Sequence, residues 1–384
     1  MKQQLLKKSL FAVIMLALWS ALIQDNLHLF KEVPLKGAFT SPEDVTFSYK
    51  KWFDGEYPEK KTEFIKYNFG FRSDFLRLHN QLKYWLFHST SESIIIGKEN
   101  YLYGDYYIDE YYGTNYRGDE KVHNNIVKLK DVQDSLLQRG TLLFVVYAPG
   151  KASFYPEYFP DNLKREKLPK TNYSEYISES RKAGLNYIDM RTWFEAMKDT
   201  SQYLLFPRGG VHWSDYGDFL AFDSLVKYIE ANTQRDLPDI RLDSIALSRK
   251  PRRRDYDLGE IMNLGIDYHH DDVLAYPRFS IADSGKQNVS VLSISDSYYY
   301  EIFDKSYRYF KEDDFWFYFG DFHSNHGGSA DKQDLPAFLS KYNVICMMYT
   351  DGSLKNFGSG FIDEAYRQFH LSTMKDKQSA NIKL

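Results

Sequence analysis

Short, largely apolar segments alternate along most of this chain with segments that have the periodicity of amphipathic helices. The apolar segments are residues 94–96, 142–147, 187–189, 289–294 and 343–349, and the helical segments are 121–139, 173–184, 215–229 and 361–369. A strand that is apolar on both sides must be covered on both sides, as in a parallel sheet between two layers of helices. The pattern therefore predicts an α/β fold with a doubly wound, mostly parallel sheet and helices on both faces. In such a sheet, ligand sites lie beyond the carboxyl ends of the strands.

The first 30 residues differ from the rest in composition. Three lysines lie within the first eight residues, and residues 9–23 then carry no charge. A basic segment before an apolar one is typical of a secretory signal, and no small-residue cleavage site follows. Residues 1–30 are therefore predicted to be an uncleaved signal anchor, a transmembrane helix in the cell inner membrane with the bulk of the chain on the periplasmic, extracytoplasmic side. A buried N-terminal helix is the alternative, because the uncharged run is short for a membrane span.

Composition excludes several kinds of site. The 384 residues carry 49 basic and 53 acidic side chains, a net charge of -4, which argues against broad binding to nucleic acid. The single cysteine, Cys346, rules out an intrachain disulfide and a multi-cysteine zinc site, and its apolar strand predicts a buried, unreactive thiol. Aromatic residues make up 17% of the chain, which suits either sugar-binding surfaces or core packing, and composition leaves both open.

The remaining chain is predicted to be one domain behind a tether. Residues 31–61 are polar and contain proline, as a tether would, and residues 62–88 have the apolar spacing of one long helix. The α/β domain is placed at 62–375, with a probable insertion or set of long loops at 233–285 and a polar tail at 376–384. The insertion holds a basic run at 249–254, which is either a solvated loop or a patch for an anionic polymer or lipid head groups.

Two polar segments have the residue types of an acyl-transfer site. Ser297 follows the apolar strand 289–294 in the turn Ser295-Asp296-Ser297, a position suited to a nucleophile, although the same turn is ordinary loop chemistry. His212 lies in a glycine-rich loop before the helix at 215–229, where it can act as general base for a serine supplied elsewhere. The alternative for His212 is a purely structural role beside a helix capped by Ser214 or Asp215.

Two histidine-containing clusters are left outside the predicted site. Asp321 and His323, with His326 nearby, lie in a polar, glycine-rich stretch that indicates a solvated loop. Residues 267–272 combine carboxylates with two adjacent histidines, whose side chains would point to opposite faces of a strand and so could not readily share a metal. No metal site is predicted.

Taken in order, four stretches resemble one known family. They are residues 69–72 with the helix to 87 and then 96–103, residues 148–151 with 155–160, Gly210-Val211-His212-Trp213, and Ser295-Asp296-Ser297. The chain is similar over about 65–370 to the SGNH-hydrolase-like proteins of polysaccharide O-acetylation, the alginate O-acetyltransferase type (AlgX/AlgJ-like). The resemblance implies an SGNH-hydrolase-like fold, Ser297 as the nucleophile and His212 as the base. Trp213, beside the histidine, and Tyr298, after the serine, are predicted to bind substrate.

The chain departs from this family at one position. Where the family has Asp-x-His-Trp, the aspartate is replaced by Gly210. Because the acid of a triad orients the histidine and stabilises its charged form, this departure leaves three alternatives. Another carboxylate, of which Asp215 is the nearest in sequence, takes over as the acid, the site works as a Ser–His dyad, or the domain binds a glycan without turning it over.

The resemblance implies an exported O-acetyltransferase or acetylesterase that acts on a cell-envelope or secreted polysaccharide. It implies a membrane-embedded acyltransferase as the acetyl donor, and no metal or nucleotide cofactor. The alternative is a non-catalytic glycan-binding or assembly protein on the same fold. A protein of D-alanyl transfer to teichoic acid is a weaker possibility, since that group places its nucleophile early in the chain and Ser297 comes late.

Overall fold

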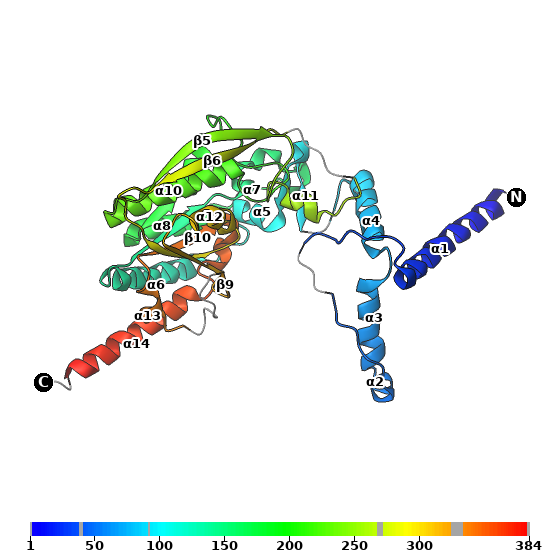
Figure 1. The fold of residues 1–384 in the computed structure, drawn as a ribbon, viewed down its shortest axis with the longest axis horizontal. Helices are drawn as coiled ribbons and strands as arrows, with labels where there is room; N and C mark the ends of the chain where they lie inside the picture. Colours follow the sequence, from blue (N-terminus) through cyan, green and yellow to red (C-terminus); the bar gives the residue numbers. More distant parts are fainter. Residues whose placement is uncertain (1, 38–40, 91–92, 267–271, 324–332, 382–384) are drawn as a thin grey trace. The chain divides into compact units, whose positions relative to one another are not determined.

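The computed structural model describes residues 2–37, 41–90, 93–266, 272–323 and 333–381 (Figure 1). Its contacts divide the chain into two compact units. The smaller consists of Met1–Ile94 and Leu258–His269, and the larger of Ile95–Asp257 and His270–Leu384. Residues 62–94, predicted to belong with the sheet, are thus grouped with the N-terminal helices instead.

The smaller unit contains α1 (Lys2–Leu27), α2 (Tyr49–Phe53), α3 (Glu56–Asn68) and α4 (Arg72–Phe87). The single helix predicted over 62–88 is two helices, because the chain turns between Asn68 and Arg72 with Phe71 in the left-handed region at φ 60°. At this turn, a Cβ atom on Gly70 would lie 2.4 Å from the carbonyl oxygen of Ala21. Only glycine therefore allows the turn to pack against the end of α1.

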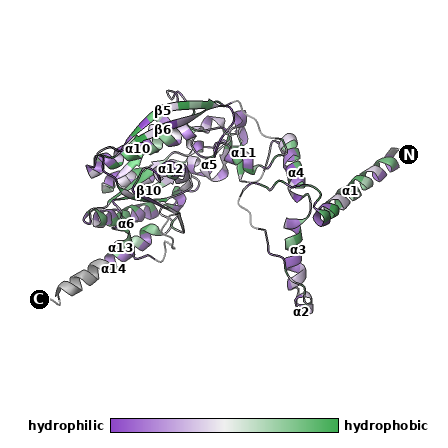
Figure 2. Ribbon diagram, viewed as in Figure 1, coloured by the Kyte–Doolittle hydropathy of each residue, from purple (hydrophilic) through white to green (hydrophobic). Residues whose placement is uncertain are grey.

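Helix α1 has the length and composition of a membrane span. Residues Gln3–Leu27 have a mean hydropathy of 1.8 over their most apolar window, and no residue of that window is buried. Figure 2 shows apolar residues along α1. A helix of 25 residues is long enough to cross the apolar part of a bilayer.

The larger unit is built on a six-stranded sheet with the order β4-β3-β10-β7-β8-β9. Its strands are β3 (Leu142–Ala148), β4 (Tyr187–Asp189), β7 (Ser290–Ser295), β8 (Glu312–Phe317), β9 (Asp321–His323) and β10 (Val344–Thr350). All neighbours pair in parallel except the edge pair β8 and β9. The predicted fold class, a mostly parallel sheet in an α/β unit, is confirmed.

Helices cover both faces of this sheet, because its central strands are apolar on both sides. Phe144 and Val146 of β3 enter one core cluster, and Leu143 and Val145 enter the other. The first cluster contains residues of α5 (Asp105–Tyr112), α7 (Lys151–Phe154), α9 (Met190–Met197), α10 (Asp215–Thr233) and α12 (Tyr299–Ser306). The second contains residues of α6 (Asp119–Leu137), α8 (Asn172–Ala183), α13 (Leu335–Leu339) and α14 (Phe361–Asn381). Cys346 is buried in the first cluster, as predicted.

The segment predicted as an insertion or long loops contains two long strands. β5 (Asp239–Ser248) and β6 (Leu274–Ala282) pair antiparallel, with Ser248 opposite Leu274, and the excursion between them includes α11 (Asp257–Ile261). The strands lie beside α10 (Figure 1), where Phe279 contacts the rings of Phe219 and Phe222. Most of β5 is exposed or half-exposed, so its sequence lacks the apolar run of the central strands. Two further short strands, β1 (Ile94–Ile96) and β2 (Leu102–Gly104), pair with each other.

Candidate active site

Ser297 stands in a rigid turn at the carboxyl end of β7. The turn is fixed by Asp296, which is almost fully buried and accepts hydrogen bonds from the backbone N–H and the hydroxyl of Thr350 at 2.8 and 2.7 Å. Its other oxygen accepts from the backbone N–H of Tyr298 at 3.1 Å. Asp296 thereby ties the end of β7 to the end of β10, and Ser297 remains partly exposed at the edge of the sheet.

His212 reaches this edge from the loop that precedes α10. The loop is held by Ser214, which caps the helix by accepting from the N–H of Gly217 and donates its own N–H to the carbonyl of Leu205 at 2.8 Å. The Nε2 atom of His212 lies 2.9 Å from Oγ of Ser297. The structure thus brings together the two residues that the sequence proposes as base and nucleophile, although 85 positions separate them.

The carboxylate at the other imidazole nitrogen is that of Asp257, the first residue of α11. Its Oδ2 lies 2.5 Å from Nδ1 of His212, and its Oδ1 accepts the backbone N–H of Val211 at 2.8 Å. One carboxylate therefore fixes both the ring and the main chain beside it. Sequence reasoning missed Asp257, because it lies in the weakly periodic insertion and no spacing connects it with His212.

Asp215, the predicted replacement acid, is engaged elsewhere. Its Oδ1 lies 3.2 Å from Arg253 and 3.5 Å from Lys305. Asp215 opens helix α10, so its side chain joins the ion pairs that connect this helix with its neighbours. Proximity in sequence to His212 was thus a poor guide, and Asp257 replaces Asp215 as the candidate acid.

Gly210 explains why an aspartate is missing from the loop. A Cβ atom at this position would lie 2.7 Å from the carbonyl oxygen of Arg254 and 3.0 Å from that of Asp255. Contacts under 3.0 Å require the backbone to move. The chain that delivers Asp257 therefore occupies the space that a side chain at position 210 would need.

Two carboxylates, the buried Glu301 and the half-buried Asp257, control the charge of His212. Glu301 of α12 is buried, and its Oε1 lies 3.3 Å from Nη1 of Arg254. Burial by itself lowers the pKa of His212, but the negative charges of Glu301 and Asp257 outweigh it and raise the pKa to about 9. The imidazolium that forms when a base takes a proton is therefore strongly stabilised here.

Lys151 is hydrogen-bonded to the loop that carries His212. Its ammonium group is buried and donates to the carbonyl oxygens of Arg208 and Gly210 at 2.5 and 2.8 Å. Burial lowers its pKa from 10.5 to about 7. Two loop carbonyls that face the interior thus have a donor, at the cost of burying a titratable amine.

Trp213 and Tyr298, predicted to bind substrate, do not face a surface. Trp213 is 1% exposed and Tyr298 is fully buried, and their rings pack against each other at 5.1 Å. The Tyr298 hydroxyl donates to the carbonyl of Val211 at 2.6 Å, and its ring lies 4.8 Å from that of His212. Both residues hold His212 in place, and neither can stack on a sugar from beneath the surface.

The histidine clusters excluded from the site are mostly beyond what the structure describes. Residues 267–271 and 326 lie outside the described residues, as do the side chains of Asp321 and His323. Asp272 accepts the N–H of Arg208 at 3.0 Å and lies 2.9 Å from its guanidinium. Within the described ranges, no group of three His, Cys, Asp or Glu residues has the arrangement of a metal site.

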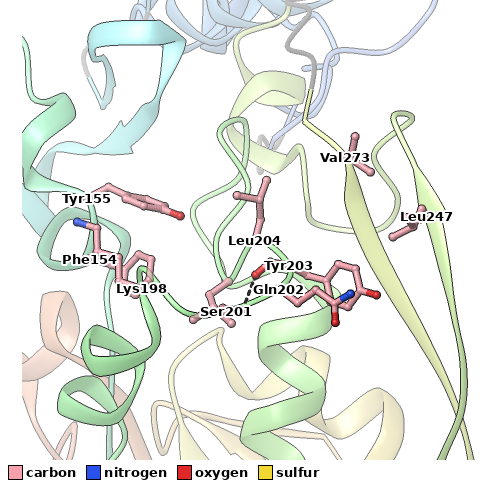
Figure 3. Close-up of a pocket in the computed structure, with 10 residues that line it drawn as sticks. Phe154, Tyr155, Lys198, Ser201, Gln202, Tyr203, Leu204, Leu247 and Val273 are labelled. Carbon is pink, nitrogen blue, oxygen red and sulfur yellow. Dashed lines mark hydrogen bonds between the residues drawn. The ribbon is translucent and has the colours of Figure 1, made fainter.

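The larger unit has two hollows whose linings do not include Ser297, His212 or Asp257. One, of about 310 Å³, is shown in Figure 3, with Tyr155 and Lys198 on one side and Leu247 and Val273 of the β5–β6 region on the other. The second, of about 590 Å³, is lined in part by Tyr318, whose backbone N–H donates to the carbonyl of Ser295, two residues before Ser297. Its lining includes three basic side chains, those of Arg117, Lys121 and Lys355.

Comparison with known proteins agrees with the resemblance found in the sequence. Residues 94–262 match the family described as "SGNH hydrolase-like domain, acetyltransferase AlgX". This range includes His212 and Asp257, and Ser297 lies beyond it. The predicted resemblance is confirmed.

The curated relatives include two proteins named probable alginate O-acetylase AlgJ. That of Pseudomonas syringae pv. tomato is 25% identical over 194 residues, 49% of this chain and 45% of the relative. That of Pseudomonas aeruginosa is 30% identical over 176 residues, 45% of this chain and 39% of the relative. The aligned part of the chain therefore spans less than half the length of these relatives.

Two of the similar solved structures come from the same group of proteins. The O-acetyltransferase domain of Pseudomonas putida AlgJ aligns over 72% of this chain and 99% of that domain, with 17% identity and a TM-score of 0.46. AlgX of Pseudomonas aeruginosa aligns over 71% of this chain and 67% of that protein, with 14% identity and a TM-score of 0.44.

Proposed function

We propose that this chain is a membrane-tethered O-acetyltransferase that modifies hydroxyl groups of a polysaccharide on the periplasmic side of the inner membrane. The observation that carries the proposal is the continuous hydrogen-bonded series of Ser297, His212 and Asp257 at the carboxyl edge of a parallel sheet. This is the arrangement of a nucleophile, a base and an orienting acid. The names of the similar proteins supply the chemical class, acetyl transfer to a polysaccharide.

In the first half-reaction, Oγ of Ser297 attacks the carbonyl carbon of an acetyl donor while Nε2 of His212 takes the hydroxyl proton. Asp257 stabilises the imidazolium through Nδ1 and keeps the ring in this orientation. The tetrahedral intermediate collapses, the bond to the donor's leaving group breaks, and His212 returns the proton to that group. The product is an acetyl ester on Ser297.

In the second half-reaction, a sugar hydroxyl attacks the acetyl ester. His212 takes the hydroxyl proton, the bond between the acetyl carbon and Oγ breaks, and the proton passes to Oγ of Ser297. Water attacking in place of the sugar would make the enzyme an acetylesterase. The two activities therefore differ only in which hydroxyl reaches the ester.

Two further features support the partners in this proposal. The basic hollow lined by Tyr318 can hold a negatively charged polysaccharide, since Arg117, Lys121 and Lys355 offer cations to its acidic groups. The span Gln3–Leu27 would keep the enzyme at the membrane, where a membrane-embedded acyltransferase can supply the acetyl group. No metal or nucleotide takes part in these steps.

Asp257 also bears on the alternative, a glycan-binding protein without activity. That alternative drew its main support from the glycine at position 210, which leaves the family's acid position empty. Because Asp257 reaches Nδ1 of His212 from another segment, the glycine no longer argues against catalysis.

The test uses the full chain in detergent with an activated acetyl ester. We expect an acetyl adduct on Ser297 in the intact mass, ester turnover, and loss of both in Ser297→Ala. Ser280→Ala is the matched control, because Ser280 lies on β6 and bonds only to Asp243 among the described contacts. A folded parent protein that forms no adduct and hydrolyses no ester would overturn the proposal in favour of glycan binding.

A further inference from the structure

The basic run 249–254 contains three consecutive arginines that each engage a different element. The guanidinium of Arg252 lies over the ring of Tyr276 on β6 at 4.4 Å. Arg253 lies 3.2 Å from Asp215 of α10. The sequence allowed a solvated loop or a patch for an anionic ligand; Arg252 and Arg253 are indeed exposed, and each also contacts a side chain of another element.

Arg254 makes the most buried of these contacts. Its Nη1 lies 3.3 Å from Glu301, and its guanidinium lies 4.7 Å from the ring centre of Tyr300. Both partners belong to α12, the helix that follows Ser297 directly. The side chain of Glu301 is 5% exposed, against 11% for Asp215. Arg254 therefore connects the segment that leads to Asp257 with the helix that follows the nucleophile.

The chain between Arg252 and Asp257 needs such support, because it forms neither a strand nor a long helix. Tyr276 also holds this segment: the N–H of Arg252 donates to the tyrosine oxygen at 3.0 Å, and that hydroxyl donates to the Asp255 carboxylate at 2.6 Å. A loop carboxylate that must stay within hydrogen-bonding distance of an imidazole depends on contacts of this kind.

We propose that the run 252–254 is an arginine clamp that positions Asp257 against His212. The inference rests on the proposed function, since positioning matters only if His212 acts as a base. These arginines are positioning residues, because their contacts are with the protein and not with the reacting atoms. The ion pair between Arg254 and Glu301 is the principal contact of this clamp, because it is the most buried of the three contacts and connects directly to α12.

Glu301 also acts on His212 through its charge. Its charge raises the pKa of His212 more than that of Arg254 lowers it. Removing both charges should therefore shift the low-pH limb of activity toward lower pH, and loss of contact with Asp257 would shift it in the same direction. The charged groups that face Glu301 are His212, Arg254, Asp255, Asp257 and Asp218.

The test compares three variants of the full chain in detergent. The double variant Arg254→Gln with Glu301→Gln removes the principal contact without leaving one charge buried alone. Arg253→Gln removes the more exposed contact with Asp215, and Arg241→Gln removes an exposed arginine of β5 outside the clamp. The rate of Ser297 modification by a sulfonyl fluoride is measured across pH by intact mass.

We expect the double variant to react about 10- to 100-fold more slowly than the parent, with its low-pH limb at lower pH. Arg253→Gln should lose less, because exposed ion pairs contribute little, and Arg241→Gln should match the parent. A double variant that keeps the parent's rate and pH limb overturns the clamp. So does a rate loss in the double variant without a shift of the limb, since that indicates a general structural role.

A second measurement separates the clamp from the proposed function. The proton between Nδ1 of His212 and Asp257 gives a downfield signal in protein labelled with ¹⁵N-histidine. A parent whose Ser297 never reacts overturns the proposed function, and loss of this signal in the double variant would still support the clamp. A double variant that retains the signal at full intensity overturns the clamp, whether or not Ser297 reacts.

Discussion

At the scale of single residues, the candidate site depends on one carboxylate, that of Asp257, which makes two contacts. Asp257 bonds to the imidazole of His212 through one oxygen and to the N–H of Val211 through the other. The ring is therefore fixed relative to its own backbone as well as relative to Ser297. An acid that only neutralised charge could sit at several distances, whereas one that orients the ring must sit here.

Replacing Asp257 with asparagine should separate the two candidate acids. We expect Asp257→Asn to lower the rate of Ser297 acylation by about 10⁴-fold, the loss associated with a misoriented triad histidine. Asp215→Asn should lose less than about 10-fold, because the ion pairs of Asp215 among the described residues are with Arg253 and Lys305 and not with His212. Acylation rates from intact mass decide this, and equal losses in the two variants would refute Asp257 as the acid.

Restoring aspartate at position 210 should not restore a second acid. We expect Gly210→Asp to destabilise the protein by about 1–3 kcal/mol, because its Cβ would press on the carbonyls of Arg254 and Asp255. For the same reason it should not rescue Asp257→Asn. Gly265→Ala is the control, since a Cβ there meets nothing within 4 Å. Urea unfolding measures the effect, and a stable Gly210→Asp protein that rescues activity would contradict this geometry.

Lys151 makes a prediction about stability and pH. Its pKa is about 7 in the folded protein, against 10.5 for an unperturbed lysine, so between these values the unfolded chain holds a proton that the folded chain has lost. Stability attributable to Lys151 therefore rises with pH over this range, by about 1.4 kcal/mol per pH unit. Full stability is present above pH 10.5 and is lost as the pH falls toward 7.

The comparison of the parent with Lys151→Met isolates this dependence, because the other titrating groups are shared. We expect the parent to gain stability relative to the variant between about pH 7 and 10 in urea unfolding. A stability difference that stays constant over this range would show that Lys151 remains charged in the folded protein.

At the scale of elements, the nucleophile's place depends on the contact between the ends of β7 and β10. Asp296→Ala would leave the N–H groups of Tyr298 and Thr350 without their acceptor. We expect a loss of about 3 kcal/mol in unfolding free energy together with slower acylation of Ser297. Thr350→Val keeps the backbone bond to Asp296 and removes the hydroxyl's bonds to Asp296, Ser353 and Tyr107, and it should cost about 1–2 kcal/mol. An Asp296→Ala protein as stable and as reactive as the parent would refute this account of the turn.

The elements also show which parts of the molecule can be predicted from sequence. Strands β3, β7 and β10 were predicted within two residues at either end, because burial on both faces leaves an uninterrupted apolar run. β5 was predicted as loop, since exposed positions dominate it. The local pattern of apolar residues predicts directly which positions are buried. It predicts which segments pair as strands only where the paired strands are also buried.

The same limit explains which residues of the candidate site could be predicted from the sequence. Ser297 and His212 each stand at a recognisable position, one after an apolar strand and one before a helix. Asp257 stands 45 residues from His212 in a segment without periodicity, and only the folded path of residues 252–257 brings it there. Gly210 showed that the family's aspartate is missing from this chain, but it did not identify a residue that takes its place.

At the scale of the whole molecule, α1 should determine where the protein resides. We expect the full chain to stay with membranes after alkaline carbonate extraction, because Gln3–Leu27 is apolar enough to span a bilayer. Placing lysines at Ile14 and Leu18 should release it, since each charge at the centre of a span is costly. Lysines at the exposed positions Leu242 and Leu247 of β5 serve as control. A double-lysine α1 variant that stays in the membrane fraction would show that another segment holds the protein there.

The two units are interleaved along the chain, and this limits how they can be exchanged in evolution. The larger unit stops at Asp257, and the next twelve residues, Leu258–His269, belong to the smaller one. Within that unit, Asn80 donates to the carbonyl of Met262, and Gln81 accepts the N–H of Ile266. A recombination that joined residue 95 onward to a different N-terminal unit would carry 258–269 into the new protein without these partners, directly after Asp257. Exchanging the smaller unit as a whole would therefore need a second crossover between β5 and β6.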